Sequence, residues 1–166
     1  MTNHLFEFKA AIVVAVTAIS AFLGWRGVLA LAWVFSMAVD YVSGTAAACV
    51  AGQWESAAAR RGLWHKAGMI LVVIVAAVAD GILSVAFENL GIGFTWPWVI
   101  LPLVLAWYLI TEFGSILENA VALGAKVPAW LVKLLKFGAK AIDDIGDKIT
   151  AEAEEMTGGK ENGSEH

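Results

Sequence analysis

Carboxylate side chains interrupt the most apolar stretches of this sequence. Asp40 lies near the middle of "WVFSMAVDYVSGTAAACV" (33–50), and Asp80 lies within the apolar run 67–87. An ionised Asp at the centre of a membrane-spanning helix costs about 2.5–3.5 kcal/mol on insertion scales, so such a residue normally faces protein or water. These acids are therefore the first candidates for function, either along an ion path or as polar contacts between helices.

Helical spacing places small and polar residues beside these acids. Ser36, Asp40, Gly44 and Ala48 recur every four residues, and small residues allow two helix backbones to approach closely. The stretch 97–120 is the most polar, with two carboxylates, hydroxyls and an amide on one broad face. We expect an intramembrane packing or assembly seam formed by Asp40, Gly44, Asp80, Glu112, Ser115, Glu118 and Asn119.

Cations are scarce at the same depth. Lys66 and Arg61 are the nearest, and a contact between Lys66 and Glu118 is a testable hypothesis. Four acids facing so few bases favour water or protonation over complete internal pairing. From the residues alone, three roles stay open: bonding between neighbouring helices, an ion or proton path, and assembly of several copies.

The composition is typical of a membrane protein. Of 166 residues, 60% are hydrophobic and 16% are charged, whereas a soluble domain is about 45–50% apolar and about 25% charged. A transmembrane helix needs about 20 apolar residues, and four stretches approach that length: 8–24, 27–50, 67–87 and 97–120. We predict an all-α integral membrane fold with a four-helix transmembrane domain over residues 1–126.

Basic residues orient these spans. Arg60, Arg61 and Lys66 follow the second span, and lysines from Lys126 onward follow the fourth. Because cytoplasmic loops are enriched in Lys and Arg, we predict both termini in the cytoplasm. A cleaved signal peptide, with "AIS" at 18–20 as the cleavage site, is a weaker alternative for the first span.

The region after the fourth span has a different character. In residues 127–142, Trp130 and several leucines fall on one helical side, and Lys133, Lys136 and Lys140 fall on another. We predict an amphipathic helix lying on the inner leaflet, with a soluble helix packed on a partner as the alternative. Residues 143–166 carry eight acidic residues and two lysines and end in a Gly-rich stretch, so we expect a disordered acidic tail.

No catalytic or ligand-binding pattern is present in the sequence. Cys49 has no second cysteine, and the three histidines do not have metal-ligand spacing. There is no nucleophile–His pairing and no phosphate-binding glycine loop. We therefore expect no enzyme activity, no cofactor and no metal, and the basic loop indicates topology rather than nucleic-acid binding.

Three stretches taken together resemble a known family. They are "DYVSGTAAACVAGQWESAAARRGLWHK" (40–66), "ADG" (79–81) and "EFGSILENAVALGAKVPAWL" (112–131), the last with a Glu-x-x-Ser-x-x-Glu-Asn pattern. Over about residues 33–137 the chain resembles the phage holins related to clostridial toxin-release proteins. The resemblance implies a protein of the bacterial inner membrane whose copies assemble into lesions. Such lesions allow an endolysin to reach the peptidoglycan without direct contact with the holin, or release a toxin.

A second class of function fits the same features. A small four-span channel or transporter subunit with a constitutive role would also carry buried acids and small-residue seams. A structural membrane partner that caps a larger complex through its tail is a weaker third hypothesis. Expression in a host separates the first two, because a holin stops growth abruptly after a delay and a transporter does not.

Overall fold

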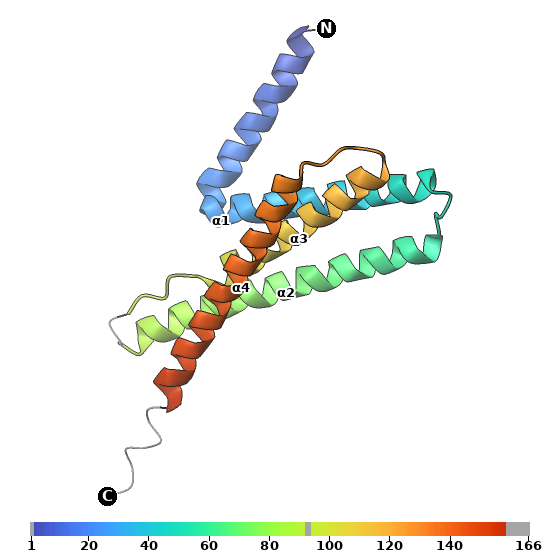
Figure 1. Ribbon diagram of the computed structural model, residues 1–166. Helices are drawn as coiled ribbons and strands as arrows, with labels where there is room; N and C mark the ends of the chain where they lie inside the picture. Colours follow the sequence, from blue (N-terminus) through green and yellow to red (C-terminus); the bar gives the residue numbers. More distant parts are fainter. Residues whose placement is uncertain (1, 92–93, 159–166) are drawn as a thin grey trace, which may run out of the picture.

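The computed structural model contains four helices and no strand over the residues that it describes. These are residues 2–91 and 94–158 for the backbone, with side chains described at Thr17, at 24–91 and 94–152, and at Glu154. The helices are α1 (Thr2–Val50), α2 (Ser56–Asn89), α3 (Ile100–Ala122) and α4 (Ala129–Gly158). The predicted all-α class is confirmed (Figure 1).

A glycine divides α1 into two parts. Gly24 has φ 66° and ψ −171°, a backbone conformation that is open to glycine and strained for residues with a Cβ. The second part, Gly24–Val50, therefore runs in a new direction (Figure 1). The bend lies at the predicted boundary between the spans 8–24 and 27–50.

Three helical segments are long and apolar enough to cross a membrane: Gly24–Val50, Ser56–Asn89 and Ile100–Ala122. They coincide with the second, third and fourth predicted spans. The side chains of the first predicted span, 8–24, lie outside the described residues except for Thr17 and Gly24, so the count of four remains a prediction. At 1.5 Å per residue α2 is about 51 Å long, more than the roughly 30 Å of a hydrocarbon core, so its polar first turns project beyond the apolar segment.

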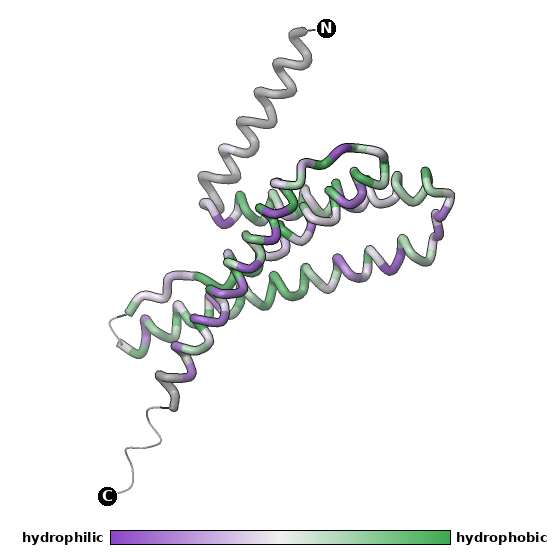
Figure 2. Tube along the Cα trace, viewed as in Figure 1, coloured by the Kyte–Doolittle hydropathy of each residue, from purple (hydrophilic) through white to green (hydrophobic). Residues whose placement is uncertain are grey.

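The three apolar segments pack as a small bundle. Gly24–Val50 and α3 run in the same direction, and α2 runs opposite to both (Figure 1). Their shared core contains Trp33, Met37, Met69, Leu105 and Leu109. The ring of Trp33 stacks on Tyr108 with centroids 5.8 Å apart, which joins α1 to α3. Outside this core many large apolar side chains are exposed, among them several of α2. Figure 2 shows a long hydrophobic stretch in the chain of α2.

The two ends of the bundle differ in composition. We call one the tryptophan end (Trp25, Trp96 and Trp98) and the other the basic end (Arg60, Arg61 and Lys126). Tryptophans that sit where a span meets the headgroups, and basic residues beyond the opposite boundary, are typical of a membrane protein with a defined orientation.

Asp80 fixes the tryptophan end. Its side chain is 0% exposed and accepts hydrogen bonds from Trp96 Nε1 at 2.7 Å, Ile100 N at 3.2 Å and Leu101 N at 2.8 Å. The first backbone N–H groups of a helix have no partner within the helix, and in an apolar surrounding they need one. Asp80 of α2 therefore caps α3 from a neighbouring helix.

The C-terminal region differs from the sequence-based expectation. Helix α4 continues to Gly158, so the predicted disordered tail is not confirmed over residues 143–158; residues 159–166 lie outside the described part. The reason is that the apolar spacing of 127–142 continues through Ile145 and Ile149, and Ala, Glu and Lys favour a helix. Helix α4 also packs against α3 (Figure 1), an arrangement other than the predicted one on the leaflet surface.

We predict that Asp80→Ala lowers the stability of the bundle by about 3 kcal/mol or more, because three buried donors lose their acceptor at about 1–3 kcal/mol each. Asp80→Asn keeps one acceptor oxygen and should cost clearly less. Thermal unfolding of the purified protein in detergent, followed by circular dichroism, measures both. Glu88→Ala, an exposed acid near the end of α2, is the control; equal losses for all three variants contradict the capping role.

Candidate functional site

A buried ion-pair cluster joins the three apolar segments. Lys66 Nζ of α2 donates to both carboxylate oxygens of Glu112 in α3, at 2.8 Å and 2.6 Å. The same ammonium lies 3.0 Å from Asp40 Oδ2 of α1. Glu112 is 3% exposed as a residue, and the Lys66 and Asp40 side chains are 13% and 19% exposed. One cation therefore connects two acids on two other helices.

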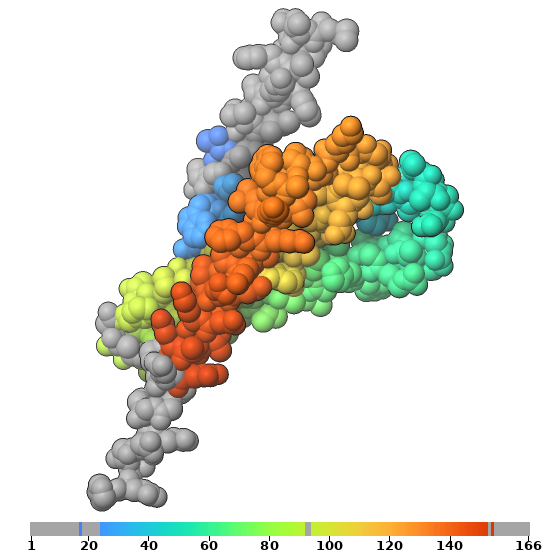
Figure 3. Space-filling view, viewed as in Figure 1, coloured from blue at the N-terminus to red at the C-terminus, as the bar shows by residue number. Residues whose placement is uncertain are grey.

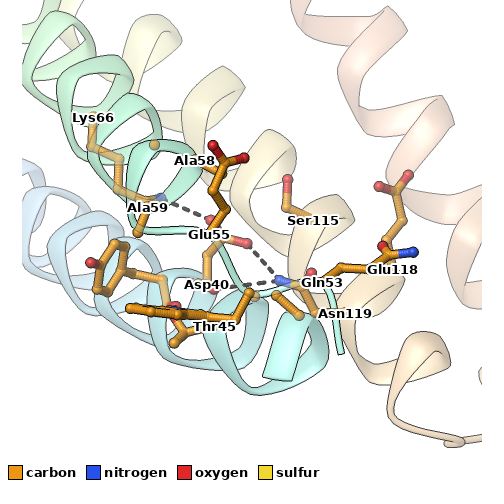
Figure 4. Close-up of a pocket in the computed structure, with 15 residues that line it drawn as sticks. Asp40, Thr45, Gln53, Glu55, Ala58, Ala59, Lys66, Ser115, Glu118 and Asn119 are labelled. Carbon is orange, nitrogen blue, oxygen red and sulfur yellow. Dashed lines mark hydrogen bonds and ion pairs between the residues drawn. The ribbon is translucent and has the colours of Figure 1, made fainter. Parts of the chain in front are cut away.

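An amide completes this cluster. Asn119 Nδ2 of α3 donates to Asp40 Oδ1 at 3.0 Å and to Ser43 Oγ at 3.1 Å. In Figure 4, Lys66 and Asn119 reach Asp40 from two sides. Gly44 makes room for the amide, because a Cβ at Gly44 would lie 3.4 Å from Asn119 Nδ2. Asp40 is thus held by an ammonium and an amide together.

The three charged residues lie at one level of the bundle. Asp40 is ten residues before the end of α1, Lys66 is ten residues after the start of α2, and Glu112 is ten residues before the end of α3. Because these helix ends all lie at the basic end, each residue is about 15 Å along its helix from that end. Asp80 lies fourteen residues beyond Lys66, about 21 Å further along α2.

A polar cavity of about 380 Å³ leads from the basic end to this cluster (Figure 4). Asp40, Lys66 and Asn119 form its inner part, and Gln53, Trp54 and Glu55 line it from the loop and the start of α2. A cavity of this size that is lined by charged and amide groups suits water. The cluster is therefore buried between helices and still connected to the basic end.

The structure brings together five of the residues singled out from the sequence: Asp40, Gly44, Lys66, Glu112 and Asn119. Ser115 and Glu118 line the cavity. The hypothesis of a Lys66–Glu118 contact was wrong, because Lys66 pairs with Asp40 and Glu112 and Glu118 is exposed. Asp80 belongs to the separate cap of α3.

The expectation that water or protonation replaces internal pairing also needs correction. Asp40 and Glu112 share Lys66, and Asp80 receives three hydrogen bonds. From the sequence, Lys66 was a topology marker beside the exposed Arg60 and Arg61 and a candidate partner of Glu118; its pairing with Asp40 and Glu112 was not expected. The sequence feature that could have revealed this pairing is the position of Lys66 directly before the apolar run 67–87. A lysine there has a side chain long enough to reach neighbouring helices.

The cluster has the chemistry of a structural and electrostatic element. No group of three His, Cys, Asp or Glu side chains that could hold a metal ion occurs among the described residues. The ammonium of Lys66 occupies the space between the two carboxylates. Counted by formal charge, the cluster carries two acids and one base, so it holds one negative charge in excess inside an apolar bundle.

One cation at the tryptophan end was also not anticipated from the sequence. The Arg26 guanidinium lies 4.8 Å from the ring centroid of Trp98 and 5.8 Å from that of Trp25. Cation–π contacts of this kind suit the boundary between apolar and polar surroundings. The pairing of Arg26 with Trp98, which is far away in the sequence, arises only in the folded bundle.

Comparisons with known proteins relate most of the chain to one family. The sequence model of the bacteriophage holin family matches residues 17–138. An uncharacterized protein of Clostridium perfringens (strain 13 / Type A) is 30% identical over 98 residues, covering 59% of this chain and 65% of that protein. An uncharacterized protein of Listeria monocytogenes serovar 1/2a is 33% identical over 106 residues, covering 63% of this chain and 68% of the relative. No solved structure matches the chain.

We predict that Lys66→Met lowers bundle stability by about 3–5 kcal/mol, since removing one partner leaves uncompensated buried charge. Combining it with Asp40→Asn and Glu112→Gln should restore most of the loss, because no unpaired charge then remains. The yield of membrane-inserted protein and its unfolding midpoint in detergent measure both effects. Arg60→Met is the exposed control, and a triple variant no better than Lys66→Met would argue against the cluster as the cause.

Proposed function

Because the chain belongs to the bacteriophage holin family, we propose that it assembles in the bacterial inner membrane into lesions that lead to lysis of the host. In this proposal the lesions allow an endolysin to reach the peptidoglycan, and no direct contact between the two proteins is required. The sequence resemblance also suggests a variant of this function, in which the lesions release a toxin.

The family match is the observation that carries this proposal. It covers residues 17–138, which include the three apolar segments and the whole Lys66 cluster. The holin family is a non-enzymatic family of membrane pore-forming proteins, so the chain is not an enzyme. The match covers only 65% of the length of the first Clostridium perfringens relative. The activity of the whole protein is therefore stated here as a proposal.

The arrangement of apolar and polar residues supports a multi-pass membrane protein. Among the described residues, three helical segments are both long and apolar enough to cross a bilayer, and large apolar side chains such as Leu71, Val75 and Val78 are exposed on α2. A soluble protein rarely exposes so large an apolar surface. We propose that the basic end faces the cytoplasm, because Arg60, Arg61 and Lys126 lie there, and that the N-terminus lies on the same side if residues 8–24 form a further span.

The cluster also supports assembly of several copies under control of the membrane potential. Moving one elementary charge across the full potential is worth about 2.3 kcal/mol per 100 mV. The excess negative charge of Asp40, Glu112 and Lys66 lies inside the bundle, where part of that potential acts on it. Summed over a homo-oligomer, the effect couples assembly to the potential.

The test of this function is expression of the protein with a separately expressed endolysin that has no export signal. We expect growth to continue during a delay, then to stop abruptly, with release of endolysin activity. A constitutive channel or transporter subunit, the alternative from another class, produces neither the delay nor the release. Continued growth with the protein inserted in the membrane contradicts the proposal.

We predict that Asp40→Asn shifts the time of growth arrest while the amount of inserted protein stays the same. The substitution removes the excess charge of the cluster, and its amide oxygen still accepts from Asn119. Glu55→Gln is the matched control, because it removes a charge from the same cavity outside the bundle core. Optical density and membrane-fraction blots provide the measurement; identical arrest times for Asp40→Asn and the parent remove the carboxylate from the timing.

A further inference from the structure

Helix α4 crosses α3 at an angle and runs in the opposite sense (Figure 1). Gly138 lies so close to α3 that a Cβ there would come within 3.0 Å of Ile110 Cδ1. Further along, Ile142 and Gly146 share a cavity with Leu103 and Trp107, near the tryptophan end of α3. A groove on the other side of this contact reaches back to Glu118. The two helices therefore stay together from about Leu103 to Glu118, about 22 Å of helix out of a roughly 30 Å hydrocarbon core.

The side of α4 that faces α3 is a seam of apolar and small residues. They recur at spacings of three and four, are half-buried, and comprise Leu131, Leu135, Gly138, Ala139, Ile142, Gly146 and Ile149. Gly138 allows the close approach to α3 at Ile110, whereas a Cβ at Gly146 would meet no atom within 4 Å. This seam explains why α4 lies on the bundle, as the space-filling view also shows (Figure 3).

A charged face runs along α4 beside the seam, and Lys136, Asp143 and Asp147 at its border line the cavities between α4 and α3. All of its residues are exposed: Lys133, Lys136, Lys140, Asp143, Asp144, Asp147 and Lys148. None of these seven residues forms an ion pair with another described residue. Gly138 lies at the level of Ile110, and Gly146 lies at the level of Leu103. The charged residues between them, Lys140, Asp143 and Asp144, therefore lie level with the part of α3 that contains the buried Leu105 and Leu109.

An exposed apolar strip lies beside the charged face. Trp130, Leu134, Phe137 and Ile145 form it, and Phe137 is 71% exposed. Acyl chains suit this strip, and they do not suit the charged face, since unpaired charges at the depth of a bilayer core are costly unless they face water. The helix thus has three sides of different chemistry: one for α3, one for apolar surroundings and one for water.

We propose that, in the assembled lesion, α4 stays against α3 and its charged face lines the water-filled lumen between copies of this chain. The inference rests on the proposed holin function and adds which surface forms the wall. It places the far end of α4 at the tryptophan end, opposite to the cytoplasmic C-terminus expected from the sequence. The competing arrangement, with α4 detached and lying on the inner leaflet, is an outcome of the test.

The first test locks α4 onto α3. Leu103→Cys and Gly146→Cys, in a Cys49→Ala background, are joined in membranes by a short thiol-reactive cross-linker before arrest. We expect the joined protein to release endolysin as well as the unjoined one, because the lesion uses the helix in place. Loss of release on joining, with full release for each single-cysteine variant under the same treatment, overturns the proposal.

The variants separate a failure of the holin function from a failure of the role assigned to α4. If the holin function itself is wrong, neither the parent nor any variant releases endolysin, joined or not. If only the role of α4 is wrong, the parent and the single-cysteine variants release endolysin and the joined protein does not.

The second test measures ion selectivity and does not depend on cross-linking. In planar bilayers at low ionic strength, Lys140→Glu should shift the cation-to-anion permeability ratio upward and Asp144→Lys downward, each by about twofold or more, because unscreened lumen charges select against like-charged ions. Arg60→Glu, an exposed change outside α4, should leave the ratio unchanged. Conducting Lys140→Glu and Asp144→Lys variants with the ratio of the parent overturn the proposal.

Discussion

The bundle depends on one lysine that reaches two carboxylates on two other helices. Lys66 holds Glu112 and Asp40 at 2.6–3.0 Å in surroundings where an unpaired charge is costly. Because the three residues come from three helices, the pairing fixes how α1, α2 and α3 are aligned along their axes. A shift of one helix by one turn, about 5.4 Å, would separate the charges, so the cluster sets the register that apolar packing alone leaves loose.

The second fixed point lies about 21 Å away along α2, where Asp80 caps α3. Together the two polar layers hold the bundle at both ends, and the apolar core of Trp33, Met37, Met69, Leu105 and Leu109 fills the space between them. Hydrogen bonds and ion pairs can fix the bundle in this way because acyl chains offer no competing partners, whereas water would. The outward side chains are then free to be apolar, as a membrane requires.

Buried polar contacts together with apolar outer surfaces suit a protein that has to insert into the membrane before it acts. The buried charges satisfy one another within a single chain, so one copy can reside in the membrane without exposing them to lipid. Helix α4 is the exception, because its lysines and aspartates remain exposed and unpaired among the described residues. The charged groups of the bundle are buried and have partners, whereas those of α4 are exposed. The surface that still requires water is the one we assign to the lumen.

The sequence by itself determined the membrane class, three of the spans and two of the buried acids, Asp80 and Glu112, because apolar length and an isolated carboxylate are local properties of the chain. Glu118, which was expected with them, is exposed. The sequence also carried the family resemblance, which the family match confirms. Only the tertiary structure decided that Lys66 pairs with Asp40 and Glu112 instead of Glu118, that Asp80 caps α3, and that α4 packs against α3. Periodicity gives the face of each helix, but which faces meet, and at what height, depends on the register between helices that are distant in the chain.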